Sequence, residues 1–320
     1  MTPVNVLAGL WLLLAVTSAN AQSLLDITFN QSRDVTQFEP LTDGVTWGTA
    51  RDQSCLIVDA GVATQALKPI AVESPTKYKL TLRAAVDDSD TIETNDRIAE
   101  IMSKNGGRSF AECELDFFDS SGNKTTFLLY GSTAVDTSGI AIVSGEFRDC
   151  VFVFYAPPNA DTLRLSLTPR KRTLYVQSLK LEPETTEGTV NCNPDFRYGQ
   201  FNAGGWRPNS EGRLFKRPDN RTVMKCGSDS RSSFFPVDDE SRYSFLCQGT
   251  GYGPISGKVI VTFYDEAGQE LGYTHLFWDR DMQQGATKSG IQPIPGSKFA
   301  MLKPSRIILE KVMVTEDDPT

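Results

Sequence analysis

The chain has 320 residues, 39% hydrophobic and 22% charged, a composition typical of a globular protein with enough apolar side chains for a sizeable core. Its 32 lysines and arginines face 40 aspartates and glutamates, and a net charge of −8 repels nucleic-acid phosphates and anionic membranes. The single histidine excludes metal sites that need two or more imidazoles, and we expect no nucleic-acid partner.

The N-terminal segment predicts secretion. Residues 1–21 carry no charge, and an apolar run from Val4 to Val16 precedes the small residues Ala19-Asn20-Ala21, which suit signal-peptidase cleavage. The run is shorter than the roughly 18 to 20 apolar residues that cross a bilayer. We therefore expect an extracellular protein with a signal peptide over 1–21 and no membrane insertion. A buried N-terminal helix is the alternative, because no basic residue precedes the run.

Six cysteines follow the predicted signal, and an even number in an oxidising compartment favours disulfides. Spacing leaves all 15 complete pairings open, and the preferred set is Cys113 with Cys150, Cys226 with Cys247 and Cys55 with Cys192. Burial as free thiols is the alternative. Candidate N-glycosylation sites are Asn30, Asn123 and Asn220, each followed by the required Ser or Thr at the second position.

Two passages repeat the same order of predicted elements. In the first, alternating strands over 78–83 and 113–118 precede the turn Asp119-Ser120-Ser121-Gly122. In the second, strands over 242–246 and 259–264 precede the turn Asp265-Glu266-Ala267-Gly268. Further strands are expected in pairs, one from each half, over 55–58 and 223–226, 163–167 and 299–302, and 174–181 and 307–314.

Aromatic residues extend the repeat, since Phe29 and Trp47 are expected to correspond to Phe196 and Trp206. Recurrence at equivalent positions favours a core role for both tryptophans. Short alternating strands between Gly, Pro, Asn and Asp turns predict an all-β fold of two tandem antiparallel β-sandwiches. A short helical insertion near 96–104 is the exception, because Ile98, Ile101 and Met102 share a helical face.

The polar stretch 183–189 places the boundary between the copies, giving domains over 22–185 and 190–320. Residues 22–188 hold 16 basic and 24 acidic side chains, whereas residues 189–320 hold 16 of each. The first domain therefore carries the whole acidic excess, and the two copies have diverged in surface chemistry.

The second half resembles the jelly-roll carbohydrate-binding modules of secreted glycosidases, which have a galactose-binding-like fold. The residues that carry the resemblance are Asn193-x-x-Phe196-x-x-Gly199, Trp206, Phe235-Pro236-Val237, Tyr243-x-Phe245 and Phe263-Tyr264-x-x-x-Gly268. The first half follows the same order less closely. The resemblance implies a jelly roll that binds a glycan. In that family a glutamate after the motif phenylalanine can belong to a calcium site, but Arg197 and Asn30 stand at this position here.

Candidate ligand-binding residues lie in the strand over 273–278. Alternation places Tyr273, His275 and Phe277 on one face and Thr274, Leu276 and Trp278 on the other. An exposed aromatic face with a histidine suits a sugar, whose C–H face packs on rings while its hydroxyls need polar partners. We take Tyr273, His275, Phe277, Trp278 and, in a Gly-rich loop, Tyr252 as candidate ligand-binding residues. Ordinary half-buried alternation is the alternative.

No catalytic motif with a recognisable spacing occurs, and no catalytic residue is assigned. No cofactor is expected, although the acidic clusters Asp87-Asp88-x-Asp90 and Asp238-Asp239-Glu240 keep calcium open as an alternative to solvated turns. The sequence favours a secreted, non-catalytic protein that binds an extracellular glycan or polysaccharide. The alternatives are an extracellular matrix or adhesion protein with a protein partner, and a polysaccharide-cleaving enzyme on a jelly roll.

Overall fold

The structure is a computed structural model that describes residues 23–31, 38, 43–87, 111–125, 139–142, 145–170, 172–184, 188–198, 204–207, 213–228, 230–252, 257–278 and 285–317. For residues 139–142, 213, 277–278 and 285–288 it describes the backbone alone. The predicted signal peptide and the predicted helix near 96–104 lie outside these residues. Within them every regular element is a β-strand, and no helix is long and apolar enough to cross a membrane.

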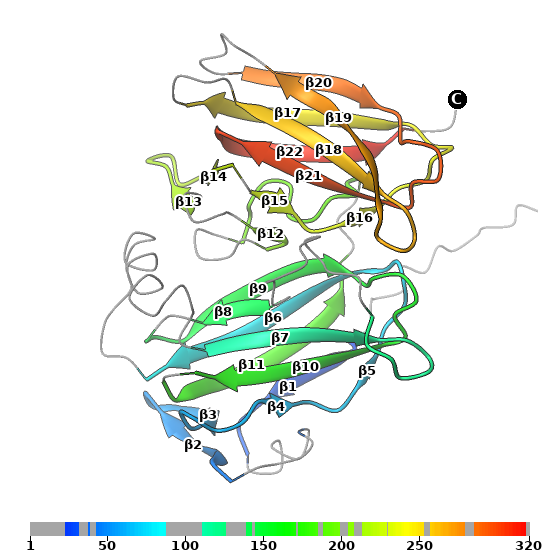
Figure 1. Cartoon of the computed structure of the whole chain (residues 1–320). Coiled ribbons are helices and arrows are strands. Elements are labelled where there is room, and N and C mark those ends of the chain that lie inside the picture. The colour runs from blue at the N-terminus through cyan, green and yellow to red at the C-terminus, as the bar shows by residue number, and fades with distance from the viewer. Residues whose placement is uncertain are drawn as a thin grey trace, which may run out of the picture.

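The first domain packs two antiparallel sheets against each other (Figure 1). Its back sheet has the order β2-β3-β11-β6-β9, with β1 paired to β11, and its front sheet has the order β4-β10-β7-β8, with β5 paired to β10. The strands are β1 (Leu25–Thr28), β2 (Val45–Ala50), β3 (Gln53–Val58), β4 (Gln65–Ala66), β5 (Ile70–Ala71), β6 (Lys77–Val86), β7 (Ala111–Phe118), β8 (Gly139–Ile142), β9 (Arg148–Tyr155), β10 (Thr162–Pro169) and β11 (Leu174–Pro183).

The second domain repeats this plan. Its back sheet has the order β13-β14-β22-β17-β20, its front sheet has the order β16-β21-β18-β19, and β12 pairs with β15 beside them. The strands are β12 (Trp206–Arg207), β13 (Arg213–Lys216), β14 (Thr222–Cys226), β15 (Arg231–Ser232), β16 (Phe235–Pro236), β17 (Tyr243–Gly251), β18 (Lys258–Tyr264), β19 (Glu270–Trp278), β20 (Gly285–Ile291), β21 (Phe299–Ser305) and β22 (Ile307–Glu316).

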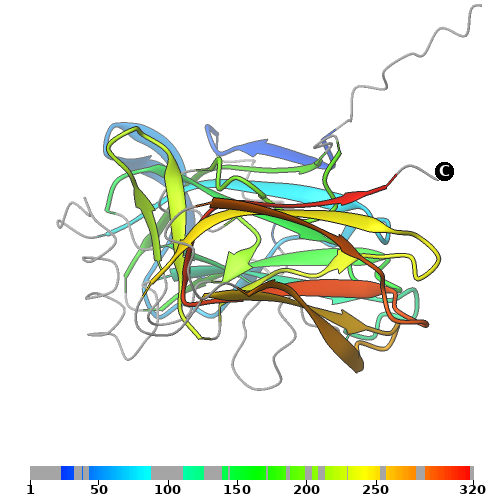
Figure 2. The same cartoon turned by 90° about the horizontal axis from the view of Figure 1, so that it is seen from above.

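The main strands of the two sheets correspond between the domains, which confirms the predicted tandem antiparallel jelly-roll sandwiches. Strands β3, β6, β7, β10 and β11 take the places of β14, β17, β18, β21 and β22. Alternation builds both cores: along β7 every second residue is buried, including Leu115 and Phe117. The two front sheets lie on one side of the molecule and the two back sheets on the other (Figures 1 and 2).

The two Asp-x-x-Gly turns form as predicted and have the same geometry. The amide of Gly122 donates to the carbonyl of Asp119 at 2.9 Å, and that of Gly268 to the carbonyl of Asp265 at 3.0 Å. Each glycine has φ near the left-handed region, +79° and +77°, where a Cβ would be unfavourable. In both turns the aspartate side chain accepts a backbone amide four residues later.

A matched pair of tyrosines marks the repeat further. Tyr78, in β6, accepts the backbone amide of Glu73 at 2.9 Å, and Tyr243, in β17, accepts that of Asp238 at 2.7 Å. In each copy the hydroxyl thus fixes the segment that leads into the strand. Both tyrosines are buried, so their hydroxyls need these partners.

The predicted equivalence of Trp47 and Trp206 is wrong. Trp206 is buried, packs against Phe196 with ring centroids 5.6 Å apart, and precedes the back-sheet strands of its domain. Trp47 lies on edge strand β2 and is 39% exposed. Phe38 occupies the corresponding place, because it stacks on Phe29 at 6.0 Å. Aromatic order alone misassigned the pair because it does not distinguish a core position from the rim of an edge strand.

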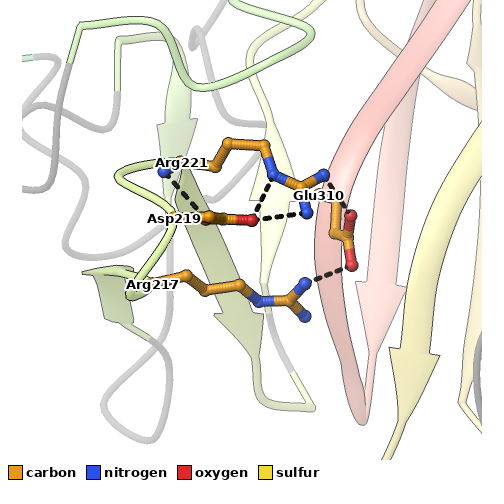
Figure 3. A network of polar contacts seen from close by, with 4 residues as sticks. All are labelled: Arg217, Asp219, Arg221 and Glu310. Atoms are coloured by element: carbon orange, nitrogen blue, oxygen red, sulfur yellow. Dashed lines mark hydrogen bonds and ion pairs between the residues drawn. The ribbon is translucent and has the colours of Figure 1, made fainter.

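A network of ion pairs and hydrogen bonds connects the β13–β14 hairpin to β22 (Figure 3). Arg217 and Arg221 each donate to one carboxylate oxygen of Glu310, the latter at 3.0 Å, and Arg221 also pairs with Asp219 at 2.7 Å. Glu310 has a side chain only 12% exposed, so its charge depends on the two guanidinium groups.

Replacing Glu310 by alanine should therefore lower the free energy of unfolding by about 2 kcal/mol, since it leaves the half-buried Arg217 without its partner. Asp219→Asn is the matched control, because Asp219 is exposed and an exposed ion pair contributes below about 1 kcal/mol. Urea unfolding of both variants measures the difference. Equal losses would show that the network acts only as surface charge.

Candidate functional site

The outer face of the second domain's front sheet carries the candidate site. On β18, Val259, Val261 and Phe263 point into the core, so Ile260 and Thr262 point to the opposite face, where Ile260 is half-buried and Thr262 is buried. Across the ladder Thr262 pairs with Tyr273 and Ile260 pairs with His275. Residues directly opposite each other share a face, which places Tyr273 and His275 on the outer surface of edge strand β19.

Tyr273 and His275 lie together on this surface. Tyr273 is 58% exposed, and the two rings meet edge to face with centroids 5.5 Å apart and planes at 89°. An edge-to-face pair places the tyrosine ring directly beside the imidazole, whose nitrogens are hydrogen-bonding groups. The arrangement presents one flat apolar surface next to a polar group, which is what a sugar ring requires.

A bulge in β19 changes the expected alternation. The register shifts between Val259 and Ile260, so that Phe277 pairs with Val259 while His275 pairs with Ile260. Leu276 is buried as expected, but Thr274 is exposed rather than facing the interior. Phe277 and Trp278 belong to β19, and their side chains lie outside the described residues.

Tyr252 does not join this surface. It follows β17 in the back sheet, its hydroxyl donates to the carbonyl of Cys226 at 2.7 Å, and the Nζ of Lys225 lies 4.8 Å from its ring centroid. A half-buried ring with a committed hydroxyl and a cation over it is a packed side chain. Tyr252 is thus half-buried, and its role in ligand binding stays a prediction.

Two charged residues that the sequence did not single out border the site. Lys303, on β21, lies across Ile260 from His275, and its Nζ is 3.6 Å from a carboxylate oxygen of Glu270. The same Nζ lies 5.7 Å from the ring centroid of Tyr264. On the same face of the sheet, Phe234, Tyr264, Phe299 and Met301 form a separate buried apolar cluster. Only the strand pairing reveals these neighbours, because they are distant in sequence.

The equivalent face of the first domain has a different chemistry. Glu112, Glu114 and Asp116 alternate outward along β7, and Arg170 pairs with both glutamates while Lys124 pairs with Asp116. Burial and the neighbouring Glu112 raise the pKa of Glu114. The face is thus a ladder of mutually neutralised charges, and the exposed aromatic pair belongs to the second domain alone among the described residues.

The predicted disulfides are absent, because all six cysteines are free thiols. Burial raises the pKa of Cys113, Cys150 and Cys247 to about 12, with the charge of Cys150 adding to the shift at Cys113. Burial likewise raises the pKa of Cys192 to about 11. Each thiol packs as a small apolar group in or beside a core. The even number of cysteines therefore follows from their packing roles and not from pairing.

The described acidic residues do not assemble a metal site. No group of three or more His, Cys, Asp or Glu side chains comes together within the described ranges. The carboxylate of Asp239 accepts the amide of Gly296, which lowers the pKa of Asp239, and Lys298 lies 3.8 Å away. Asp238 accepts the amide of Glu240 at 3.0 Å, so this cluster shapes a turn. Asp88 and Asp90 lie outside the described residues.

The three sequon asparagines, Asn30, Asn123 and Asn220, are exposed. Asn220 lies at the tip of the β13–β14 hairpin with φ +69°, and the Nδ2 of Asn123 donates to Asp119 at 3.2 Å. All three side chains are accessible at turns, as N-glycosylation requires.

No protein-family model matches the sequence, and no curated protein matches it. Solved structures similar to the chain include a CBM22 tandem from Paenibacillus barcinonensis Xyn10C, with 11% identity, 93% of this chain and 98% of that chain covered, and a TM-score of 0.35. A CBM6 module of Cellvibrio mixtus lichenase 5A, solved with cellotriose, has 11% identity and a TM-score of 0.28. The match covers 51% of this chain and 99% of that chain. A triple jelly roll of an archaeal virus has 10% identity and a TM-score of 0.37. The match covers 94% of this chain and 67% of that chain. Similarities this low say nothing about what the chain binds.

Proposed function

We propose that the protein is a secreted, non-catalytic carbohydrate-binding protein that holds an extracellular glycan on the outer face of its second domain's front sheet. The observation that carries the proposal is the exposed Tyr273 ring set edge to face against His275 on edge strand β19. Sugar C–H faces pack on such rings, and His275, Lys303 and Glu270 supply donors and acceptors around it. The domain limits 22–185 and 190–320, the signal over 1–21 and glycosylation at the three sequons belong to the same proposal.

Replacing Tyr273 by alanine should weaken glycan binding about tenfold, since an aromatic contact contributes on the order of 1 kcal/mol beyond its buried area. The measurement is affinity electrophoresis of the full-length protein against a panel of soluble polysaccharides, followed by titration calorimetry with the best binder. Leu271→Ala is the matched control, because Leu271 is an exposed apolar residue of the same strand. The site assignment fails if Tyr273→Ala binds as tightly as the wild type.

Two other functions make different predictions in the same assay. A matrix or adhesion protein would bind none of the polysaccharides and would instead capture a protein partner, with the acidic first domain as the contact surface. A polysaccharide-cleaving enzyme would release reducing ends or unsaturated products during the incubation. Binding without product release supports the proposal.

A further inference from the structure

Strand β9 contributes side chains to both hydrophobic cores. Phe152 and Phe154 point into the first domain's sandwich and belong to its core cluster. Val153 and Tyr155 alternate to the opposite side, where they belong to the core cluster of the second domain. One strand at the edge of the first domain's back sheet is therefore shared between two domains.

Polar contacts close the same junction. The Tyr155 hydroxyl donates to the carbonyl of Val190 at 2.7 Å, and the Nζ of Lys77 donates to the carbonyl of Thr189 at 2.8 Å. Lys77 pairs with Tyr155 in the ladder, and its Nζ lies 5.3 Å from the tyrosine ring centroid. Lys77 is only 8% exposed, and burial lowers its pKa. A lysine this buried requires the acceptor and the ring that the junction provides.

The segment that receives these contacts is bonded to the second domain's central strand. The amide of Val190 donates to the carbonyl of Val314, and the side-chain amide of Asn191 bridges Val312 and Val314 at 2.8 Å each. A continuous chain of contacts thus runs from β9 through residues 189–191 to β22.

The backbone of β9 and that of the second domain are in close contact at Gly205. A Cβ on this residue would lie 2.6 Å from the carbonyl oxygen of Val153 and 2.7 Å from the Cβ of Cys192. Its φ of +101° also excludes most side chains. This close approach means that the second domain's residues are shaped around β9, as in a core, and do not merely touch it.

From these contacts we infer that the second domain is not an autonomous module and that β9 is an obligatory part of its core. The two domains then unfold as one cooperative unit, and their front sheets are held facing the same side (Figures 1 and 2). The inference does not depend on which ligand the protein binds.

Hydrogen exchange of the full-length chain, resolved by mass spectrometry of peptides, tests this inference through Tyr155→Ala. The cavity left in the shared core should speed exchange in β17 and β22 about a hundredfold, although neither strand belongs to the mutated domain. Tyr155→Phe removes only the hydroxyl and should speed exchange in β17 and β22 about fivefold. This variant replaces Tyr155→Ala in the test if the alanine variant does not fold. Arg83→Met is the control on the strand and face of Lys77. Arg83 pairs with exposed Asp149 and donates to Gln177, both in the first domain, so its loss should leave exchange in β17 and β22 unchanged.

Two results would overturn the inference. Faster exchange confined to β6 and β9, with β17 and β22 unchanged in Tyr155→Ala, would show that the domains are independent. Two separate calorimetric unfolding transitions in the wild type would show the same without any substitution.

Discussion

Raising the pH from 8 to 10 is expected to lower the free energy of unfolding by about 4 kcal/mol through three thiols alone, two of them buried and one, that of Cys150, half-buried. Cys113, Cys150 and Cys247 have a pKa of about 12 in the folded protein against an ordinary value of 9.0. Each is neutral when folded, but it ionises on unfolding above pH 9, and each pH unit between the two pKa values costs about 1.4 kcal/mol per thiol. The stabilisation is complete below pH 9 and is lost as the pH rises toward 12.

Other buried groups also change how the free energy of unfolding depends on pH. Burial raises the pKa of Tyr155 and Tyr243, so they add to the loss above pH 10. Lys77 acts in the opposite direction, because its pKa is lowered by burial and stability rises with pH between its folded and unfolded values. One lysine does not offset several thiols and tyrosine hydroxyls, so the free energy of unfolding decreases with pH above pH 9.

Urea unfolding between pH 7 and 10.5 measures this dependence. Thiol titration in denaturant without reductant is the control, and it should count six thiols. The native protein at pH 8 should react slowly, because five of its thiols are buried and the sixth, that of Cys150, is half-buried. A flat stability profile together with fewer than six thiols would mean that the cysteines are paired.

Much of the fold follows from local sequence. Strands over 78–83 and 113–118 were predictable because apolar and polar residues alternate, which favours a half-buried strand, and the strand over 259–264 because it is a short run of β-branched and aromatic residues. The Asp-x-x-Gly turns were predictable because each needs a side-chain acceptor and a residue with positive φ. Their recurrence in the same order gave the tandem architecture.

The parts that could not be predicted depend on pairing between distant strands. Lys303 and Glu270 approach each other because β21 and β19 flank β18, and nothing local to either residue encodes that order. The bulge at Leu276 is a single-residue register shift that alternation does not reveal. Tyr252 looked like an exposed loop aromatic until the carbonyl of Cys226, from another strand, accounted for its hydroxyl.

The two tryptophans that the sequence pattern equated should differ sharply when replaced by alanine. Trp206→Ala is expected to lower the free energy of unfolding by about 4 kcal/mol, the range for removing a buried aromatic side chain. Its indole N–H donates to the carbonyls of Cys192 and Asn193 at 3.0 Å each, so the variant also leaves these buried acceptors without that donor.

Trp47→Ala is the matched control, with an expected loss below about 1.5 kcal/mol because the ring on edge strand β2 is 39% exposed and keeps part of its surface in water when folded. Guanidinium unfolding of the full-length variants measures both losses. Similar losses at the two positions would restore the equivalence that the sequence suggested and would place Trp47 in the first core. A loss confined to Trp206 would instead show that its indole holds the backbone at Cys192 and Asn193 in place, next to the residues where β9 enters the same core.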